Sequence, residues 1–372
     1  MIYADNAATT KLDPDALEAA MPFLLDEYGN ASQPYLFAKS AKEAIADARK
    51  TIAACIGAKP EEIYFTSGGT ESDNWSIKGS AVSDKKKRTT ITSEIEHHAI
   101  LNACAAIERH GFPVTYLPVT DEGVVQPKKL ETYITDRTRL VSIMMANNEV
   151  GTIEPIAELV KITHEHGALF HTDAVQAVGH IPIDVKKLGV DMLSASAHKF
   201  GGMKGSGFLY IRNGVSLSPF ADGGSQEHGR RAGTENVAAI VAMAVALKKN
   251  CDRMEETTQK LRKLSQIFIE ALTAVGIDYR LNGSSNHLPG NVNISIRGAE
   301  GEMLLHRMDL KGICISTGSA CDSVNTRSSH VIEAIHVPEE YAEGTIRVTF
   351  GAENTEKEAV TIAESLIDIL KK

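Results

Sequence analysis

The sequence predicts an α/β fold in which a large, mostly parallel sheet is followed by a smaller α+β unit. After about residue 35, helix-like and strand-like segments alternate, which is typical of parallel strands joined by helices. In the last third this alternation ends, and the pattern becomes that of an α+β unit. The length of 372 residues also favours two domains. We expect a large domain over residues 15–255 and a small domain over residues 1–14 and 256–372.

The individual elements follow from apolar spacing and from the residues that end helices. Ala38–Ile56 has the spacing of an amphipathic helix, and Gly57 after it is a helix-stop signal. Further helices of the large domain are predicted at Ala99–His110 and Ile156–His166. The predicted strands of the large domain are Glu62–Thr66, Arg88–Thr92, Val114–Leu117, Leu140–Met145, Ala168–Thr172, Met192–Ala195 and Gly207–Ile211. One long helix around Val237–Val275 is expected to end the large unit. After it, the predicted strands are Asn291–Ile296, Ile313–Ser316 and Ile346–Thr349. The predicted helices after it are Glu300–Met308 and a last helix that begins at Thr355.

Composition narrows the class of protein. The net charge of −9 argues against a nucleic-acid-binding protein, which needs a basic face. The first residues lack the basic and apolar regions of a signal peptide, and no window approaches the roughly 20 apolar residues of a membrane span. The five cysteines are scattered and show no metal-site spacing, so no metal is expected. We expect a cytoplasmic protein with free thiols, each by default a small apolar residue.

Polar residues follow five of the predicted strands. Ser67–Thr70 follow the first strand, and His97 comes shortly after the second. The other three groups follow later strands: Asn147 and Asn148, Asp173, and the run Ser196, His198 and Lys199. In an open parallel sheet the ligand binds beyond the carboxyl ends of the strands. The set therefore predicts a ligand site, although each residue alone has an ordinary structural explanation.

The chemistry that fits this set is an aldehyde cofactor with a phosphate group. Pyridoxal 5'-phosphate (PLP) needs a lysine for its Schiff base and an acidic partner for the pyridine nitrogen. Lys199 and Asp173 can fill these roles. Gly69 and Thr70 at a helix start, with Ser196 and His198, can hold the phosphate. A P-loop is excluded because the glycine-rich run 201–207 lacks its spacing.

Several motifs resemble those of class V aminotransferase-fold enzymes, which implies the PLP-dependent transferase (aspartate aminotransferase-like) fold. The motifs are Ser196–Lys199, Asn147–Gly151 and His171–Gln176. Within that fold, four more motifs look like those of the NifS/IscS-type cysteine desulfurases: Phe65–Ser72, Glu96–His97, Arg231–Thr234 and Ser316–Cys321. The likeness runs from Asp5 to about Gly351, and the segment ending in Cys321 discriminates most, since aminotransferases of this fold lack it.

The resemblance implies a role for each matching residue. Lys199 would carry PLP, His97 would stack on its ring and help to move protons, and Asp173 would pair with the ring nitrogen. Asn148 and Gln176 would contact ring substituents. The phosphate would be held by Gly69, Thr70, Ser196 and His198, with Thr234 supplied by the second subunit of a homodimer. Arg347 would bind the substrate carboxylate, with Asn30 nearby.

The implied activity is removal of sulfur from L-cysteine, giving L-alanine and a persulfide on Cys321. A sulfur-acceptor protein would then receive the sulfur for iron–sulfur cluster assembly or for thio-cofactor synthesis or tRNA thiolation. Three alternatives remain open: a selenocysteine lyase or other class V β-lyase, an aminotransferase, and a weakly catalytic sulfur-relay protein. The segment Gly29–Tyr35 departs from the family pattern, because it is one residue shorter and lacks the usual histidine.

Overall fold

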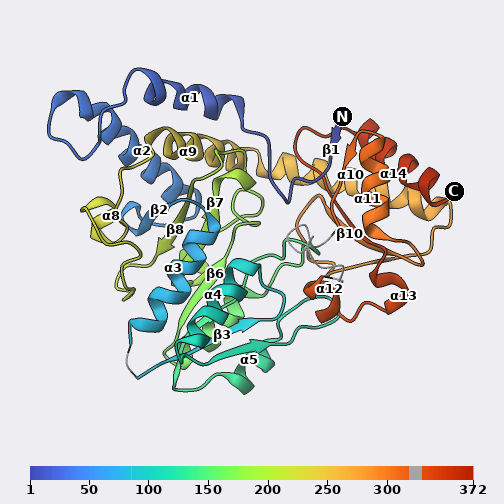
Figure 1. Cartoon of the computed structure of the whole chain (residues 1–372), viewed down its shortest axis with the longest axis horizontal. Coiled ribbons are helices and arrows are strands. Elements are labelled where there is room, and N and C mark those ends of the chain that lie inside the picture. The colour runs from blue at the N-terminus through green and yellow to red at the C-terminus, as the bar shows by residue number, and fades with distance from the viewer. Residues whose placement is uncertain (85, 318–328, 372) are drawn as a thin grey trace.

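The computed structural model describes residues 1–84, 86–317 and 329–371, and Figure 1 shows a larger and a smaller unit side by side. The elements up to residue 211 are β1 (Ile2–Tyr3), α1 (Pro14–Leu25), η1 (Leu36–Ala38), α2 (Lys39–Cys55), η2 (Pro60–Glu62), β2 (Ile63–Thr66), α3 (Gly69–Val82), β3 (Thr89–Ser93), α4 (His98–Arg109), β4 (Val114–Leu117), α5 (Pro127–Tyr133), β5 (Thr138–Ser142), α6 (Ile156–Glu165), β6 (Leu169–Asp173), α7 (Val185–Leu188), β7 (Met192–Ser196), η3 (Ala197–Lys199) and β8 (Gly207–Ile211). The elements after it are α8 (Gln226–Gly229), α9 (Val237–Asp252), α10 (Met254–Ala274), β9 (Tyr279–Leu281), β10 (Asn291–Ile296), α11 (Gly301–Leu310), β11 (Ile313–Cys314), α12 (His330–Ala334), α13 (Glu339–Ala342), β12 (Thr345–Thr349) and α14 (Glu356–Leu370).

The larger unit is built on a seven-stranded sheet of order β2-β8-β7-β6-β5-β3-β4. Only β8 runs antiparallel to its neighbours, β2 and β7, and the remaining pairs are parallel. Parallel strands bring their carboxyl ends to one edge of the sheet, where Asp173 and Ser196 end β6 and β7. The predicted fold class is confirmed.

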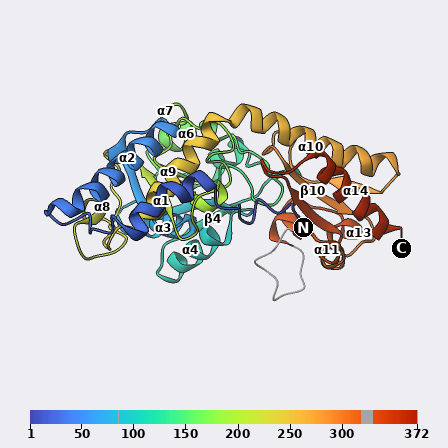
Figure 2. The same cartoon turned by 90° about the horizontal axis from the view of Figure 1, so that it is seen from above.

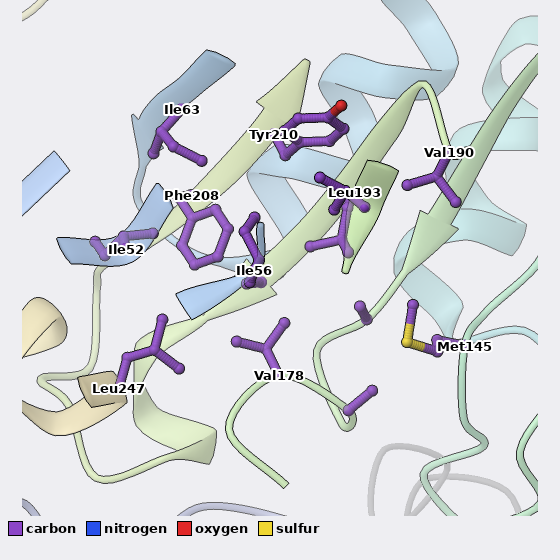
Figure 3. Packing of buried hydrophobic residues seen from close by; sticks show 14 of the residues in the cluster. Ile52, Ile56, Ile63, Met145, Val178, Val190, Leu193, Phe208, Tyr210 and Leu247 are labelled. Atoms are coloured by element: carbon purple, nitrogen blue, oxygen red, sulfur yellow. The ribbon is translucent and has the colours of Figure 1, made fainter. Parts of the chain in front are cut away.

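Helices cover both faces of this sheet, and adjacent strand residues divide between two cores. On β7, Leu193 belongs to the core under α2, α6 and α9, whereas Met192 belongs to the core under α3 and α4. This follows from the period of two in a strand, which points successive side chains to opposite faces. Figure 3 shows Leu193 packed with Phe208 and Val178 in the first of these cores.

The smaller unit combines an antiparallel sheet of order β12-β10-β9 with helices α10, α11 and α14. β1 pairs in parallel with β11, with Ile2 opposite Ile313, so the first strand of the chain joins the smaller unit. Figure 2 shows α10 extending from the larger unit along the smaller one. The division into two domains near residue 255 stays a proposal.

The structure corrects one predicted helix and adds one that was not predicted. The single long helix expected at Val237–Val275 is two helices, α9 and α10, with Arg253 between them at φ −107° and ψ 8°. The chain turns there because α9 packs into the core of the larger sheet, whereas α10 packs into the second core beside α14. α1 was not predicted, although Asp13 caps it and Pro14 begins it. Over the described residues, no helix is both long and apolar enough to span a membrane.

Candidate active site

Lys199 lies directly beyond the carboxyl end of β7, in η3. Its Nζ donates hydrogen bonds to the carbonyl oxygens of Ala7 (2.6 Å) and Ala8 (2.9 Å). The side-chain Nε2 of Gln176 donates to the same Ala7 carbonyl at 2.9 Å. Lys199 and Gln176 are therefore brought together by the amino-terminal segment.

Asp173 is the buried last residue of β6. Its Oδ1 accepts a hydrogen bond from the Val175 N–H at 2.9 Å. Burial raises the pKa of Asp173 to about 6, while the Val175 N–H and the charge of Lys199 act in the opposite direction. A cation placed against this carboxyl group would favour its ionised form. The site can therefore hold a protonated ring nitrogen.

A buried polar network lies beside Asp173 and was given no role from the sequence. His171 Nδ1 is 2.8 Å from Ser142 Oγ, and its Nε2 is 2.9 Å from Ser194 Oγ. Asp73 Oδ1 lies 3.7 Å from His171 Nε2. Burial lowers the pKa of His171 to about 3 and raises that of Asp73 well above its ordinary value, and the Asp173 charge also raises the pKa of Asp73. The neutral forms of both groups are thus favoured, and the Asp173 carboxylate carries the negative charge of this region.

The sequence did contain a signal for Asp73. It stands four residues after Gly69 on α3, so it shares the helix face that begins at the predicted phosphate site. A carboxyl group on the inner face of a helix is unusual, because an unpaired buried charge is strongly disfavoured.

His97 caps the start of α4, and its Nδ1 accepts a hydrogen bond from the Ala99 N–H at 3.1 Å. Burial lowers the pKa of His97 to about 4, and the positive charges of Lys199 and His98 act in the same direction. The ring is therefore neutral near pH 7. With Nδ1 accepting, the proton of the neutral ring is on Nε2. This gives a flat neutral ring with one N–H donor.

The predicted phosphate site is a close approach between the start of α3 and the end of β7. Gly68 precedes α3 with φ +147°, and a Cβ built on it would lie 3.4 Å from Ser196 Oγ. A Cβ on Gly69 would lie only 2.6 Å from Val175 Cγ2. Among the described residues, no side chain caps the N–H groups at this helix start, so they can bind an anion. Thr70, next on α3, is exposed.

His198 lies in η3, two residues after Ser196. Its Nδ1 lies 3.1 Å from Thr9 Oγ1. Burial lowers the pKa of His198 to about 4, and the charges of Lys199 and Lys204 add to this. His198 can therefore contribute a neutral hydrogen-bonding ring.

Arg347, on β12, is buried and links the smaller unit to the larger one. Its Nη2 donates to Asp5 Oδ1 at 2.7 Å, and its Nη1 donates to the Asn148 carbonyl at 2.7 Å. Its Nε is buried without a hydrogen-bond partner in the described part of the chain. An unpartnered guanidinium donor is what a substrate carboxylate needs.

Within the described residues of the single chain, Asn30 and Thr234 are not joined to this group. Asn30 lies between α1 and η1, where its Oδ1 accepts the Ser32 N–H at 3.0 Å. Thr234 is exposed on the loop after α8, close to the ion pair of Arg231 and Glu71 (2.8 Å). Cys321 lies outside the described residues. Their roles stay predictions.

A cavity of about 610 Å³ adjoins this group on the side of the amino-terminal segment. Its wall includes Ala7, Gln176 and Lys199, together with Asn291 of the smaller unit. Asp173 and His97 are not part of its wall. The cavity therefore lies next to the predicted cofactor site and does not coincide with it.

The residues present fit PLP. Lys199 supplies an amine, buried Asp173 supplies a carboxyl group that a ring cation would stabilise, and the glycines at the start of α3 leave the helix N–H groups open. The close approach at Gly69 requires a glycine, because a side chain there would overlap Val175.

Comparison with known proteins identifies the family of the chain. The family model for class-V aminotransferases matches residues 2–361. The chain is 47% identical over its whole length to "Cysteine desulfurase IscS" of Methanosarcina thermophila, covering 92% of that protein. It is 49% identical to the protein of the same name from Dictyoglomus turgidum, covering all of the chain and 95% of that protein. A solved structure, described as a NifS-like protein, superposes with a TM-score of 0.94 at 37% identity, covering 100% of this chain and 99% of the other. The chain therefore belongs to the class V aminotransferase family, within the group that contains the cysteine desulfurases.

Proposed function

We propose that this protein is a PLP-dependent cysteine desulfurase that converts L-cysteine to L-alanine and passes the sulfur to an acceptor through Cys321. The observation that carries the proposal is the convergence of Lys199, Asp173 and His97 at the carboxyl edge of the sheet. It occurs in a chain whose relatives at 47% and 49% identity are named cysteine desulfurases.

Each residue contributes a defined step. PLP, when bound, supplies an electron sink for the carbanion that forms at the substrate Cα. Lys199 binds the cofactor and then removes the Cα proton through its amine. Asp173, as the carboxylate, stabilises the protonated ring nitrogen. His97 presents a neutral ring whose Nε2 can exchange protons with the substrate.

Arg347 binds the substrate, and Cys321 removes its sulfur. Arg347 binds the substrate carboxylate through its guanidinium, which holds the substrate near Asn148. The Cys321 thiolate attacks the substrate sulfur, so that an S–S bond forms and the Cβ–S bond breaks with its electron pair left on the carbon fragment. That fragment takes up protons and leaves as alanine. The persulfide on Cys321 is then available to an acceptor thiol.

We also propose that the protein is a homodimer. Large apolar side chains are exposed along α1 and the segment that follows it, namely Leu17, Met21, Leu24, Leu25, Tyr28, Tyr35, Leu36 and Phe37. A concentration of exposed apolar side chains on one segment favours burial against a second copy. The exposed Thr234 loop can then reach the partner's phosphate site. Light scattering checks this, and a fully active monomer would remove Thr234 from the site.

The sulfur acceptor is proposed to be a separate protein, in iron–sulfur cluster assembly or another thiolation pathway. The net charge of −9 does not favour direct binding of nucleic acid. The free cysteines Cys55, Cys104, Cys251 and Cys314 support a reducing, cytoplasmic location.

The decisive experiment separates cofactor chemistry from sulfur transfer. Lys199→Ala is expected to lose the yellow colour of bound PLP and all alanine formation. Cys321→Ala is expected to stay yellow and to change its absorption with L-cysteine, yet to release no alanine and carry no protein-bound sulfur by intact mass. If Cys321→Ala makes alanine and sulfide at the wild-type rate, the protein is a β-lyase and the proposal is wrong.

A further inference from the structure

Two cysteines that the proposed reaction does not use lie at the ends of neighbouring helices. Cys55 is the last residue of α2, and Cys251 is in the last turn of α9. Both are free thiols and half-buried, so a small reagent can reach them.

Helical spacing turns both side chains toward the same interface. Ile52 stands three residues before Cys55, and Leu247 stands four residues before Cys251, so each pair shares a helix face. Ile52 and Leu247 are fully buried in one core cluster, and Figure 3 shows them in the same region of it. Cys55 and Cys251 pack against this cluster, and their thiol groups contact each other.

The contact makes the two sulfurs unequal. The hydrogen bond between the thiols lowers the pKa of Cys251, and the same bond, together with burial, raises the pKa of Cys55. The neighbouring Lys248 favours the thiolate form of both residues, whereas Asp252 opposes it. Cys251 is therefore the thiol that ionises more readily, and Cys55 donates the hydrogen bond to it.

We propose that Cys55 and Cys251 form a redox-active dithiol, which a low-molecular-weight disulfide such as glutathione disulfide converts to an intramolecular disulfide between α2 and α9. The Cys251 thiolate attacks one sulfur of the oxidant, which forms a mixed disulfide and releases one glutathione. Cys55 then loses its proton and attacks the Cys251 sulfur, which releases the second glutathione. The protein loses two hydrogen atoms, and the oxidant is reduced to two thiols.

The position of this bond gives it a structural effect. All seven strands of the larger sheet lie between Cys55 and Cys251 in the sequence, so the bond closes a long loop in the unfolded chain. Long-loop disulfides restrict the unfolded state, and this favours the folded protein. Cys251 also lies next to the turn at Arg253, where the chain passes from α9 to α10. The disulfide formed on oxidation therefore cross-links the end of α2 to the end of α9, beside that turn.

The test is peptide mapping of the PLP-loaded protein after incubation in glutathione buffers of increasing oxidation, with free thiols alkylated before trypsin digestion. The cleavage sites place Cys55 in the peptide Thr51–Lys78 and Cys251 in the peptide Asn250–Arg253. We expect these two peptides to appear joined in the wild type, with a higher melting temperature that returns to its starting value on reduction. Cys55→Ser and Cys251→Ser should instead keep one glutathione on the remaining cysteine and show no such stabilisation.

Cys314→Ser is the matched control, because it also removes a half-buried thiol, and it should leave the joined peptide unchanged. The proposal is overturned if Cys55 and Cys251 are both still alkylated under conditions in which Cys314 has become glutathionylated. It is equally overturned if each forms a mixed disulfide in the wild type without joining the other. Because the readout is the joined peptide, failure of the desulfurase proposal would leave this result unaffected.

Discussion

Gly69→Ala is expected to weaken PLP binding through a single methyl group. The added Cβ would lie 2.6 Å from Val175 Cγ2, well inside van der Waals contact. Valine is confined to few rotamers, so the strain passes to the Val175 backbone, whose N–H is bonded to Asp173 Oδ1 at 2.9 Å. Gly69 is the first residue of α3 and does not have a positive φ, so alanine meets no backbone penalty there.

Overpacking of this kind typically destabilises by about 1–3 kcal/mol, and we expect PLP affinity to fall by roughly 5- to 150-fold. Titration of the apoprotein with PLP, followed by absorbance, measures the change. The double variant Gly69→Ala/Val175→Ala should recover most of the affinity, because the overlapping methyl group is gone. Gly111→Ala is the control, since no atom of the described residues lies within 4 Å of its Cβ position. Wild-type affinity in Gly69→Ala, or no recovery in the double variant, would refute this account of the site.

Three further predictions concern the charged and aromatic groups. Because burial raises the pKa of Asp173 from 3.8 to about 6, its contribution to apoprotein stability is present below pH 3.8 and is lost as the pH rises through about 6. Urea unfolding of Asp173→Asn should lack this loss, and identical pH profiles for variant and wild type would contradict the assignment. Arg347→Lys should raise KM for L-cysteine by about tenfold or more in steady-state assays, with a smaller change in kcat. The reason is that a lysine cannot form the paired hydrogen bonds of a guanidinium. An unchanged KM would show that Arg347 does not bind the substrate. His97→Phe should keep bound PLP but slow the exchange of the substrate Cα proton with solvent deuterium, measured by NMR, whereas a wild-type exchange rate would leave His97 with a stacking role alone.

Local patterns predicted most of the large sheet, because most of its strands are short runs of β-branched or apolar residues, and polar residues follow five of them. Val114–Leu117 and Gly207–Ile211 have the predicted bounds. β5 ends at Ser142 rather than at Met145, yet Ile143 and Met145 still donate backbone hydrogen bonds to β6, which explains why the apolar run resembled a longer strand. Apolar spacing records burial, and burial continues past the point where regular pairing stops.

The contacts that complete the site could not be predicted in the same way. Lys199 is held by backbone carbonyls of Ala7 and Ala8, and any residue can supply a carbonyl. The pair of Asp5 and Arg347 joins residues at opposite ends of the chain, and no periodic pattern relates them. The turn at Arg253 was missed for a similar reason, since it depends on which core each helix packs against.

The amino-terminal segment is bonded to both units within a few residues. Asn6 Nδ2 donates to the Thr349 carbonyl at 2.8 Å, and Ala7 offers its carbonyl to Lys199. Since Ala8 takes part only through its backbone carbonyl, which accepts from Lys199 at 2.9 Å, saturation mutagenesis should find Ala8 tolerant of substitution. Deletion or insertion of one residue between Asn6 and Lys11 would shift every carbonyl out of register and should abolish activity. An affinity tag on Met1, which is 97% exposed, would leave this register intact.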